Sequence, residues 1–259
     1  MTTLRVAAAQ IASGPDKDAN LVTAVDAVRA AADAGARVVV LPEATMVAFG
    51  TRLRDAAEPL DGPFCDALRA AAAQHDVLLV AGVFEPADDP QGRVHNTLLV
   101  TGAGVEARYR KVHMYDAFGG GESTRVAPGD EYVTVDALGT TFGLATCYDV
   151  RFADQFTALG RRGAQVVLLP ASWSDGPNKA EQWDLLTRAR AADAQAWLVA
   201  ADQPWNAESA RTPRGIGRSV VADPYGQARA RLDGAPGLLV HDVDLAAVTT
   251  ARETIPLLR

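Results

Sequence analysis

The chain alternates between amphipathic segments and short, continuous apolar runs. Residues 17–34 carry Leu21, Val25, Val28 and Ala32 at helical spacing, with a glycine just past the last turn, and this pattern predicts an amphipathic helix. The apolar runs between such segments have no regular polar positions, which favours strands that are buried on both faces. Alternation of this kind is typical of an α/β protein, in which helices cover a sheet.

The same patterns predict an ordered series of helices and strands along the chain. Helices are expected over residues 17–34, 64–75, 152–161 and 179–195. Strands are expected over residues 4–10, 37–41, 77–84, 94–101, 105–109, 141–146, 165–169, 196–201, 217–222 and 238–242, the fourth and fifth joined as a hairpin. Because the strand and helix order of the first half returns in the second, we expect two sheets packed as a sandwich, each covered by helices on its outer face.

Length and composition fit one compact unit. A chain of 259 residues with 48% hydrophobic content suits one large α/β domain, and no Pro/Gly/Ser-rich linker divides it. We therefore expect a single domain over residues 1–259. A long polar stretch at residues 112–131 contains the run FGGGE. Because a loop of this length in a compact domain is usually functional, we expect it to form one wall of a site.

Charge and cysteine content disfavour several classes of protein. A net charge of −7 and a pI near 5.1 argue against nucleic acid or an anionic membrane surface as partner. No stretch approaches the length of a membrane span, and the first residues lack a basic segment followed by a long apolar core. The two Cys residues cannot form a disulfide framework, which fits a reducing compartment. We therefore expect a cytoplasmic protein.

Three residues whose side chains could take part in catalysis stand at the ends of predicted strands: Glu43, Lys111 and Cys147. A thiol becomes a nucleophile only as the thiolate, so it needs a base to take its proton and a cation to stabilise negative charge. Glu43 and Lys111 can supply these two functions. Lys is scarce, because Lys111, Lys17 and Lys179 are the three Lys among 25 Lys and Arg residues. Cys147 also precedes a predicted helix, whose N-terminal dipole favours a thiolate.

Each of these residues also has a plain structural explanation. A buried Cys is usually an inert apolar residue, and Cys65, on one face of the predicted helix 64–75, fits that description. A Glu after a strand can be a solvated carboxylate, and a Lys after Arg-Tyr-Arg can be a surface charge. The residues that flank the three positions make the combination specific.

The sequence gives less support to metal-dependent, nucleotide-binding and serine-hydrolase chemistry. The four His residues, at positions 75, 95, 113 and 241, show no metal-ligand spacing, and there is no C-x-x-C motif. The glycines at 119–121 do not follow a strand, and neither G-x-x-x-x-G-K-[ST] nor G-x-S-x-G occurs. We therefore expect neither a metal nor a cofactor.

The segments around the three residues resemble the nitrilase superfamily, also called the carbon-nitrogen hydrolases. The similarity begins with LRVAAAQ at residues 4–10, continues through LPE at 41–43, YRKVH at 109–113 and CYDVRF at 147–152, and ends near DPYG at 223–226. It covers nearly the whole chain. The resemblance implies a four-layer α-β-β-α sandwich and a homodimer or larger assembly, formed when helices of two subunits pair.

The resemblance also implies roles for individual residues. Glu43, Lys111 and Cys147 correspond to the catalytic triad of the family, and Glu122, in the loop after the Lys, corresponds to a fourth site residue. In the implied mechanism Glu43 activates the Cys147 sulfur, which attacks an amide carbonyl, forms a thioester and releases ammonia. The oxyanion would lie between Lys111 and the backbone N–H of Tyr148.

Two further residues are candidates for the substrate pocket. Trp173 follows a predicted strand exit, although a Trp there can equally serve core packing. His113 lies near Lys111 and can instead be an ordinary hydrogen-bonding residue.

The resemblance narrows the substrate only in part. CYDVRF is similar to the branch of ω-amidases and deaminated-glutathione amidases, so we expect a small amide with a carboxylate, which an Arg could bind bidentately. The chain departs from the common pattern at Ala153, at Gln182 and at residues 192–194, around the pocket or its supporting helix. An N-carbamoyl-amine hydrolase, a nitrilase, a glutamine-cleaving synthetase subunit and a non-catalytic binding module on the same fold remain alternatives.

Overall fold

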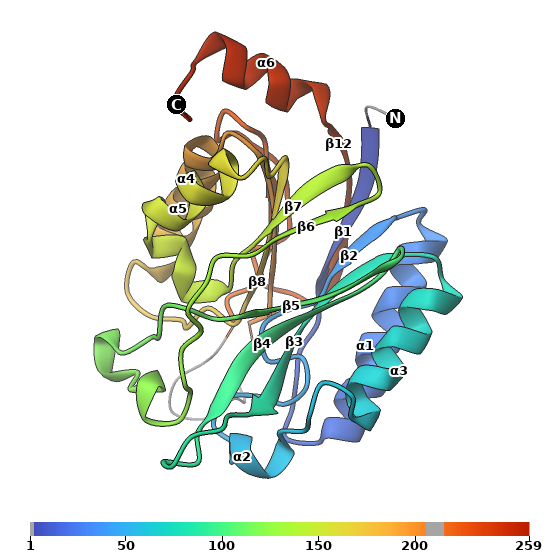
Figure 1. The fold of residues 1–259 in the computed structure, drawn as a ribbon, viewed down its shortest axis with the longest axis vertical. Coiled ribbons are helices and arrows are strands. Elements are labelled where there is room, and N and C mark those ends of the chain that lie inside the picture. Colours follow the sequence, from blue (N-terminus) through green and yellow to red (C-terminus); the bar gives the residue numbers. More distant parts are fainter. Residues whose placement is uncertain (1–2, 206–214, 259) are drawn as a thin grey trace.

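Two six-stranded sheets form the centre of the molecule (Figure 1). The computed structural model describes residues 3–205 and 215–258. The first sheet consists, in spatial order, of β12 (Gly237–Asp244), β1 (Thr3–Gln10), β2 (Val38–Val40), β3 (Leu78–Pro86), β4 (Val94–Gly102) and β5 (Val105–Arg110). The second consists of β11 (Ala228–Arg231), β10 (Val220–Ala222), β9 (Trp197–Asp202), β8 (Val166–Ala171), β7 (Thr140–Leu144) and β6 (Thr134–Ala137).

Both sheets are mixed, with parallel strands at the centre. The strands β1, β2 and β3 run parallel to one another, and so do β7, β8 and β9. All other pairs are antiparallel, including the tight β4–β5 hairpin that the sequence predicts. Because parallel strands end at the same edge of a sheet, the segments that follow them emerge close together.

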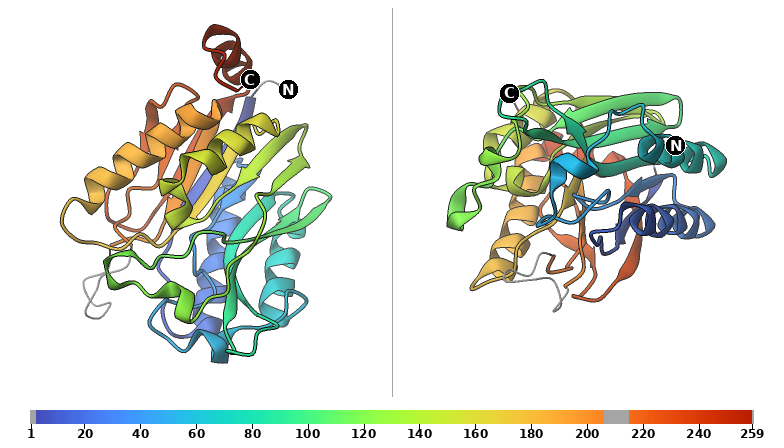
Figure 2. Two further views of the ribbon diagram at one scale, coloured as in Figure 1. Left: turned by 60° about the vertical axis from the view of Figure 1, so that its left-hand side comes forward. Right: turned by 90° about the horizontal axis from the view of Figure 1, so that it is seen from below.

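Helices cover the outer face of each sheet. The helices α1 (Lys17–Asp33) and α3 (Pro63–Gln74) lie on the first sheet, and α4 (Ala153–Arg161) and α5 (Lys179–Ala194) lie on the second, so the pairs stand on opposite sides of the molecule (Figures 1 and 2). The remaining helices are α2 (Leu53–Ala56), α6 (Ala246–Thr254) and the 3-10 turns η1 (Ala117–Gly119), η2 (Glu122–Thr124) and η3 (Cys147–Arg151). The layers therefore follow the order α-β-β-α, as the sequence predicts.

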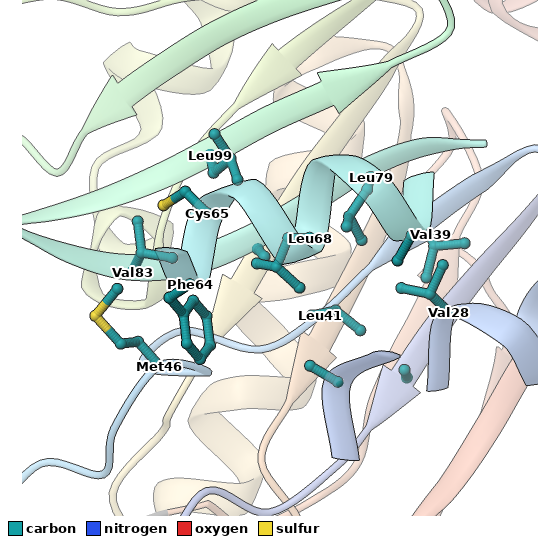
Figure 3. Packing of buried hydrophobic residues seen from close by; sticks show 14 of the residues in the cluster. Val28, Val39, Leu41, Met46, Phe64, Cys65, Leu68, Leu79, Val83 and Leu99 are labelled. Atoms are coloured by element: carbon teal, nitrogen blue, oxygen red, sulfur yellow. The ribbon is translucent and has the colours of Figure 1, made fainter. Parts of the chain in front are cut away.

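The apolar runs of the central strands are continuous because these strands are buried on both faces. In β2, Val39 packs toward α1 and α3, whereas Val38 and Val40 pack between the two sheets. Figure 3 shows part of the hydrophobic cluster between the first sheet and the helices α1 and α3, which includes Leu68 of α3 and Leu79 of β3. Alternate side chains of one strand thus belong to different layers, and a single apolar run fixes two interfaces at once.

The predicted helices and the ten predicted strands all occur, with small shifts at their ends. One prediction was too long, because β10 begins at Val220 rather than at residue 217. The short edge strands β6 and β11 and the helices α2 and α6 were not predicted. In the described part of the chain, no helix is both long enough and apolar enough to cross a membrane.

Candidate active site

A pocket lies where segments from both sheets meet. Glu43 follows β2, Lys111 follows β5, Cys147 follows β7 and Ser172 follows β8, and all four line this pocket. Its volume is about 150 Å³. Because sites for drug-sized ligands span roughly 300–1,000 Å³, this pocket suits a small molecule.

Lys111 is buried between two carboxylates. Its Nζ donates to Glu43 Oε1 at 3.0 Å and to both oxygens of Glu122, at 3.0 and 2.9 Å, and only 2% of its side chain is exposed. Burial alone would lower the pKa of this ammonium, but the charges of Glu122 and Glu43 outweigh burial and hold the pKa well above its usual value. The side chain is therefore a fixed positive charge.

Asn96 and Ser172 hold the Glu43 carboxylate from two directions. Asn96 Nδ2 donates to Glu43 Oε1 at 2.8 Å, and the backbone N–H of Ser172 donates to Glu43 Oε2 at 3.0 Å. Asn96 stands in the middle of β4 and is 1% exposed. With Lys111 on Oε1 as well, both carboxylate oxygens have fixed partners, so the group has one orientation.

Gly82 lets the segment that carries Glu43 approach β3 closely. A Cβ atom at Gly82 would lie 2.7 Å from both the Glu43 Cα and the Ala44 nitrogen, and 2.8 Å from the Pro42 carbonyl oxygen. Side chains do not tolerate such contacts with backbone atoms, so this strand position requires glycine. The adjacent Ala44 has a positive φ of 59°, which turns the chain directly after Glu43.

Glu122 links the long loop to the site. Its Oε2 accepts from the backbone N–H of Tyr115 at 2.6 Å, and its own N–H donates to the Tyr115 carbonyl at 3.2 Å. Asn96 Nδ2 also reaches Glu122 Oε1, at 3.3 Å. The loop at residues 112–131, expected from its length to form a wall, lines the pocket with residues of η1 and η2.

Cys147 occupies a tight turn at the start of η3. Its φ of 45° is in the left-handed region, which is unfavourable for a residue with a side chain and is found mainly at functional sites. Two reciprocal bonds close the turn, because Asp149 Oδ2 accepts from the Thr146 N–H at 2.8 Å and the Asp149 N–H donates to the Thr146 carbonyl oxygen at 2.9 Å. The nucleophile candidate is thus held by its own local sequence.

A thiolate at Cys147, which the sequence suggested through the helix dipole, is disfavoured in the free protein for other reasons. Burial raises the pKa of the Cys147 thiol well above its usual value, and the charge of Glu43 and a hydrogen bond to it raise it further. Lys111 and the Ser172 N–H lower this pKa, but by less. The thiol therefore keeps its proton until a base removes it. Cys65 packs in the core below α3, and burial raises its pKa to about 12 (Figure 3).

His113 lies outside the pocket, contrary to its assignment from the sequence. Its Nδ1 is 2.8 Å from Asp149 Oδ1, and its ring stacks on Phe152 with centroids 3.6 Å apart. Asp149 also accepts from the Tyr109 hydroxyl at 2.7 Å. His113 therefore supports the turn that carries Cys147 rather than the pocket wall.

Tyr148 and Trp173 do line the pocket, as the sequence suggested. The Trp173 indole donates to the Lys179 carbonyl oxygen at 3.0 Å, and its backbone N–H donates to Asp202 at 2.8 Å. Tyr148 is the second residue of η3. The first N–H groups of such a turn have no acceptor within the turn, so they are available to a ligand.

The residues of this site that sequence reasoning missed include Asn96, Ser172 and Lys179. Asn96 had a signal, because it is a polar residue inside a strand predicted to be buried, and a buried polar residue needs a partner. Lys179 also had one, as one of only three Lys residues in the chain. Ser172 acts through its backbone N–H, which no side-chain pattern can reveal.

The positions that depart from the common pattern of the family, Ala153, Gln182 and residues 192–194, are not among the residues that line the pocket. Gln182 accepts from Arg151 Nη2 at 2.7 Å. Arg190 donates to a backbone carbonyl of η3 at 3.1 Å and pairs with Asp193 at 2.7 Å. Ala153 is the first residue of α4. Within the described ranges, no group of three or more His, Cys, Asp or Glu side chains is placed to hold a metal ion.

Comparison with known proteins gives a consistent result. A family model described as carbon-nitrogen hydrolase matches residues 5–253. The chain is 46% identical to Hydrolase Rv0480c of Mycobacterium tuberculosis, over 99% of this chain and 95% of that protein. It is 32% identical to omega-amidase NIT2 of Mus musculus, over 100% of this chain and 95% of that protein.

Two further relatives extend the comparison. The chain is 33% identical to the deaminated glutathione amidase of Escherichia coli O157:H7, over 98% of this chain and 95% of that protein. The crystal structure of Saccharomyces cerevisiae Nit3, a member of branch 10 of the nitrilase superfamily, matches with a TM-score of 0.87 and 27% identity, over 100% of this chain and 96% of that chain. The four-layer sandwich is therefore of the nitrilase type.

Proposed function

This chain belongs to the carbon-nitrogen hydrolase family, and from that premise we propose that it hydrolyses a small amide through a thioester on Cys147 and releases ammonia. The observation that carries the proposal is the contact of Lys111 with Glu43 and Glu122 in the pocket that also contains the thiol. A nucleophile, a base and a fixed cation thus face one small cavity, which is what acyl transfer requires.

Glu43 acts as the general base. Two carboxylates surround the Lys111 ammonium next to the thiol, so a further anion on sulfur is unfavourable, in keeping with the raised pKa of Cys147. The proton therefore moves to Glu43 as the sulfur–carbon bond forms. When the tetrahedral intermediate collapses, the C–N bond breaks and Glu43 returns that proton to the departing nitrogen. Glu43 then takes a proton from the water that attacks the thioester and passes it to the sulfur as the C–S bond breaks, which yields a carboxylic acid and restores both the thiol and the Glu43 carboxylate.

Lys111 and the Tyr148 N–H stabilise the oxyanion. The ammonium is held at a fixed position, so its charge needs no reorganisation when the carbonyl oxygen becomes negative. Loss of one such donor typically lowers the rate by about two to three orders of magnitude.

Glu122 positions Lys111 and the loop. Its two oxygens contact Lys111 Nζ, and Oε2 also accepts from the Tyr115 N–H. Glu43, and not Glu122, is in hydrogen-bonding contact with the Cys147 thiol, so Glu122 orients the cation and the loop wall rather than taking part in proton transfer.

For the substrate, we favour an ω-amide that carries a carboxylate. Two relatives, named omega-amidase and deaminated glutathione amidase, support this class. Ammonia release from a panel of ω-amides, N-carbamoyl amines and nitriles distinguishes it from the other activities of the superfamily. Preference for a carbamoyl compound or a nitrile would defeat the amide assignment, and no reaction with any of them would favour a binding module.

Mass spectrometry of the acylated protein tests the different roles that we propose for Glu43 and Glu122. Glu43→Gln should give no thioester on Cys147 because the base is lost. Glu122→Gln keeps shape and hydrogen-bonding reach, so it should still acylate Cys147, at a lower rate. Equal and complete acylation of both variants would contradict these roles.

We also propose that the chain forms homodimers through helices on its outer faces. Leu185 of α5 is 66% exposed and Tyr225, between β10 and β11, is 42% exposed, so both side chains are accessible for burial in an assembly. Light scattering coupled to size-exclusion chromatography tests this directly, and a monomer at micromolar concentration would exclude it.

A further inference from the structure

Lys179 is an almost fully buried cation in the pocket. It is the first residue of α5, lines the same cavity as Cys147 and is only 7% exposed. In the described parts of the chain, no Asp or Glu side chain forms an ion pair with it, and its polar contact is the Tyr115 hydroxyl at 3.5 Å. Buried charges are normally paired, so this ammonium is a candidate for an anionic ligand.

Aromatic rings surround this ammonium. Its Nζ lies 4.0 Å from the centre of the Phe118 ring, 5.3 Å from that of Tyr115 and 5.5 Å from that of Trp173. Such rings stabilise a cation through their π faces without supplying a counter-charge. They therefore keep Lys179 ionised and in place while leaving its charge available to a ligand.

Phe118 adopts a strained conformation over Lys179. Its φ is 56°, although it is not a glycine, and its side chain is 70% exposed, so core packing does not explain the conformation. The next turn packs tightly, because a Cβ at Gly120 would lie 2.2 Å from the Tyr115 carbonyl oxygen. The loop is therefore built to hold the ring against the ammonium.

Of the other cations near the pocket, Lys111 is paired with carboxylates, whereas Arg125 and Arg151 bond to neutral groups in the described part of the chain. Lys111 contacts two carboxylates, and Arg125 donates to the Gly120 carbonyl at 3.5 Å. Arg151 bonds to Gln182 and lies 5.0 Å from the Trp173 ring, so its charge adds to the positive potential around Lys179. Lys179 and Arg151 thus place two positive charges beside the Trp173 ring, and these charges attract an anionic group of the substrate.

We propose that Lys179 binds a carboxylate at the end of the substrate remote from the amide that Cys147 attacks, and that it thereby selects ω-amides of carboxylic acids over neutral amides. This inference rests on the proposed amide hydrolysis. The expected Arg is thus replaced by a Lys, whose compact ammonium fits between the rings. A charged anchor far from the scissile bond positions the carbonyl, so its loss affects kcat as well as KM.

The test compares succinamate with succinamide, which have nearly the same shape and differ in the charge of the distal group. The wild-type protein should prefer succinamate in kcat/KM. Lys179→Met should lower this preference by about 10- to 100-fold, the usual effect of losing a hydrogen-bonded charge. Lys179→Glu should reverse it and favour 3-aminopropanamide, whose distal group is an ammonium.

Lys17→Met is the matched control, because Lys17 lies away from the pocket and pairs with Glu58. It should leave the ratio of the two kcat/KM values unchanged. If Lys179→Met does not fold, as judged by circular dichroism, Lys179→Gln takes its place in the same comparison.

The outcomes separate the inference from the function on which it rests. If the wild-type protein releases ammonia from neither these amides nor longer homologues, the proposed hydrolysis fails. If it hydrolyses both amides but prefers succinamide, or if Lys179→Met changes the ratio by less than about twofold, the anchor is refuted. Collapse of the ratio in Arg125→Gln with Lys179→Met unaffected would likewise refute it.

Discussion

Asn96 Nδ2 donates to Glu43 Oε1 at 2.8 Å, on the same oxygen that accepts from Lys111. This bond joins a residue in the middle of β4 to the carboxylate that we propose as general base. It leaves Glu43 Oε2, which accepts from the Ser172 N–H, as the oxygen with fewer side-chain partners. The orientation of the base therefore depends on a neutral amide from a neighbouring strand.

Replacement of Asn96 by Leu tests this dependence. The substitution keeps the size of the side chain but removes the donor, so Glu43 loses its fixed orientation. We expect kcat for ammonia release to fall about tenfold to hundredfold, the usual cost of misplacing a catalytic group. Thermal unfolding should show a folded protein, and an unchanged kcat would mean that Lys111 and Ser172 suffice to orient Glu43.

The two Cys residues should differ sharply in their contribution to activity. Cys147→Ala should abolish ammonia release while preserving the fold, because it removes the nucleophile without adding bulk. Cys65→Ala should keep most of the activity and lower stability by about 1 kcal/mol, since it leaves a small cavity below α3. The reverse pattern of activities would show that the nucleophile is misassigned.

Lys111 should not tolerate Arg. Nζ touches three carboxylate oxygens within 3.0 Å, and the side chain is 2% exposed, so the longer planar guanidinium cannot take its position. We expect kcat/KM to fall by about two to three orders of magnitude. A variant with nearly normal kcat/KM would reduce Lys111 to a structural charge.

The pH dependence of thiol alkylation should report the charge of Glu43. Because that charge raises the pKa of Cys147, reaction of the wild-type protein with iodoacetamide should be slow at neutral pH and increase steadily as the pH rises. Glu43→Gln removes the negative charge, so the pKa should fall and alkylation should begin at a lower pH. Peptide mass spectrometry resolves Cys147 from Cys65, and an unchanged or raised pKa in the variant would contradict this account.

Gly82→Ala should lower both the stability and the activity of the protein, although Ala is tolerated at most strand positions. The added Cβ would lie 2.7 Å from the backbone at Glu43, so either β3 or the Glu43 segment must move. We expect a loss of about 1–3 kcal/mol in unfolding free energy together with lower activity. Gly14→Ala is the control, because its nearest neighbour would be 3.9 Å away, and equal effects of the two would argue against this explanation.

Hydrophobic pattern predicted the helices and the buried strands because each of those strands packs on both faces. It failed at β6 and β11, which are short edge strands, and the side chains of β11 are mostly exposed. Such strands form through pairing with a neighbour rather than through an apolar run of their own. The helix α6 was missed for a related reason, since it buries only Val248 and Ala251.

The candidate site was predictable where chemistry depends on side-chain type and sequence neighbours. Glu43, Lys111, Glu122 and Cys147 lie together as the resemblance implied. The state of the thiol was not predictable, because its pKa depends on burial and on the distance to Glu43, which only the packed sheets determine. His113 was misplaced because a position near Lys111 in sequence does not fix the direction of its ring, which stacks on Phe152.

The bond between Glu43 and the Ser172 N–H spans residues that are 129 positions apart, one following β2 of the first sheet and the other following β8 of the second. Neither half of the chain alone contains both the proposed base, Glu43, and the proposed nucleophile, Cys147. During refolding, catalysis should therefore return only when the two sheets have docked, later than the secondary structure of either half. Enzyme turnover is thus a direct assay for completion of the tertiary fold.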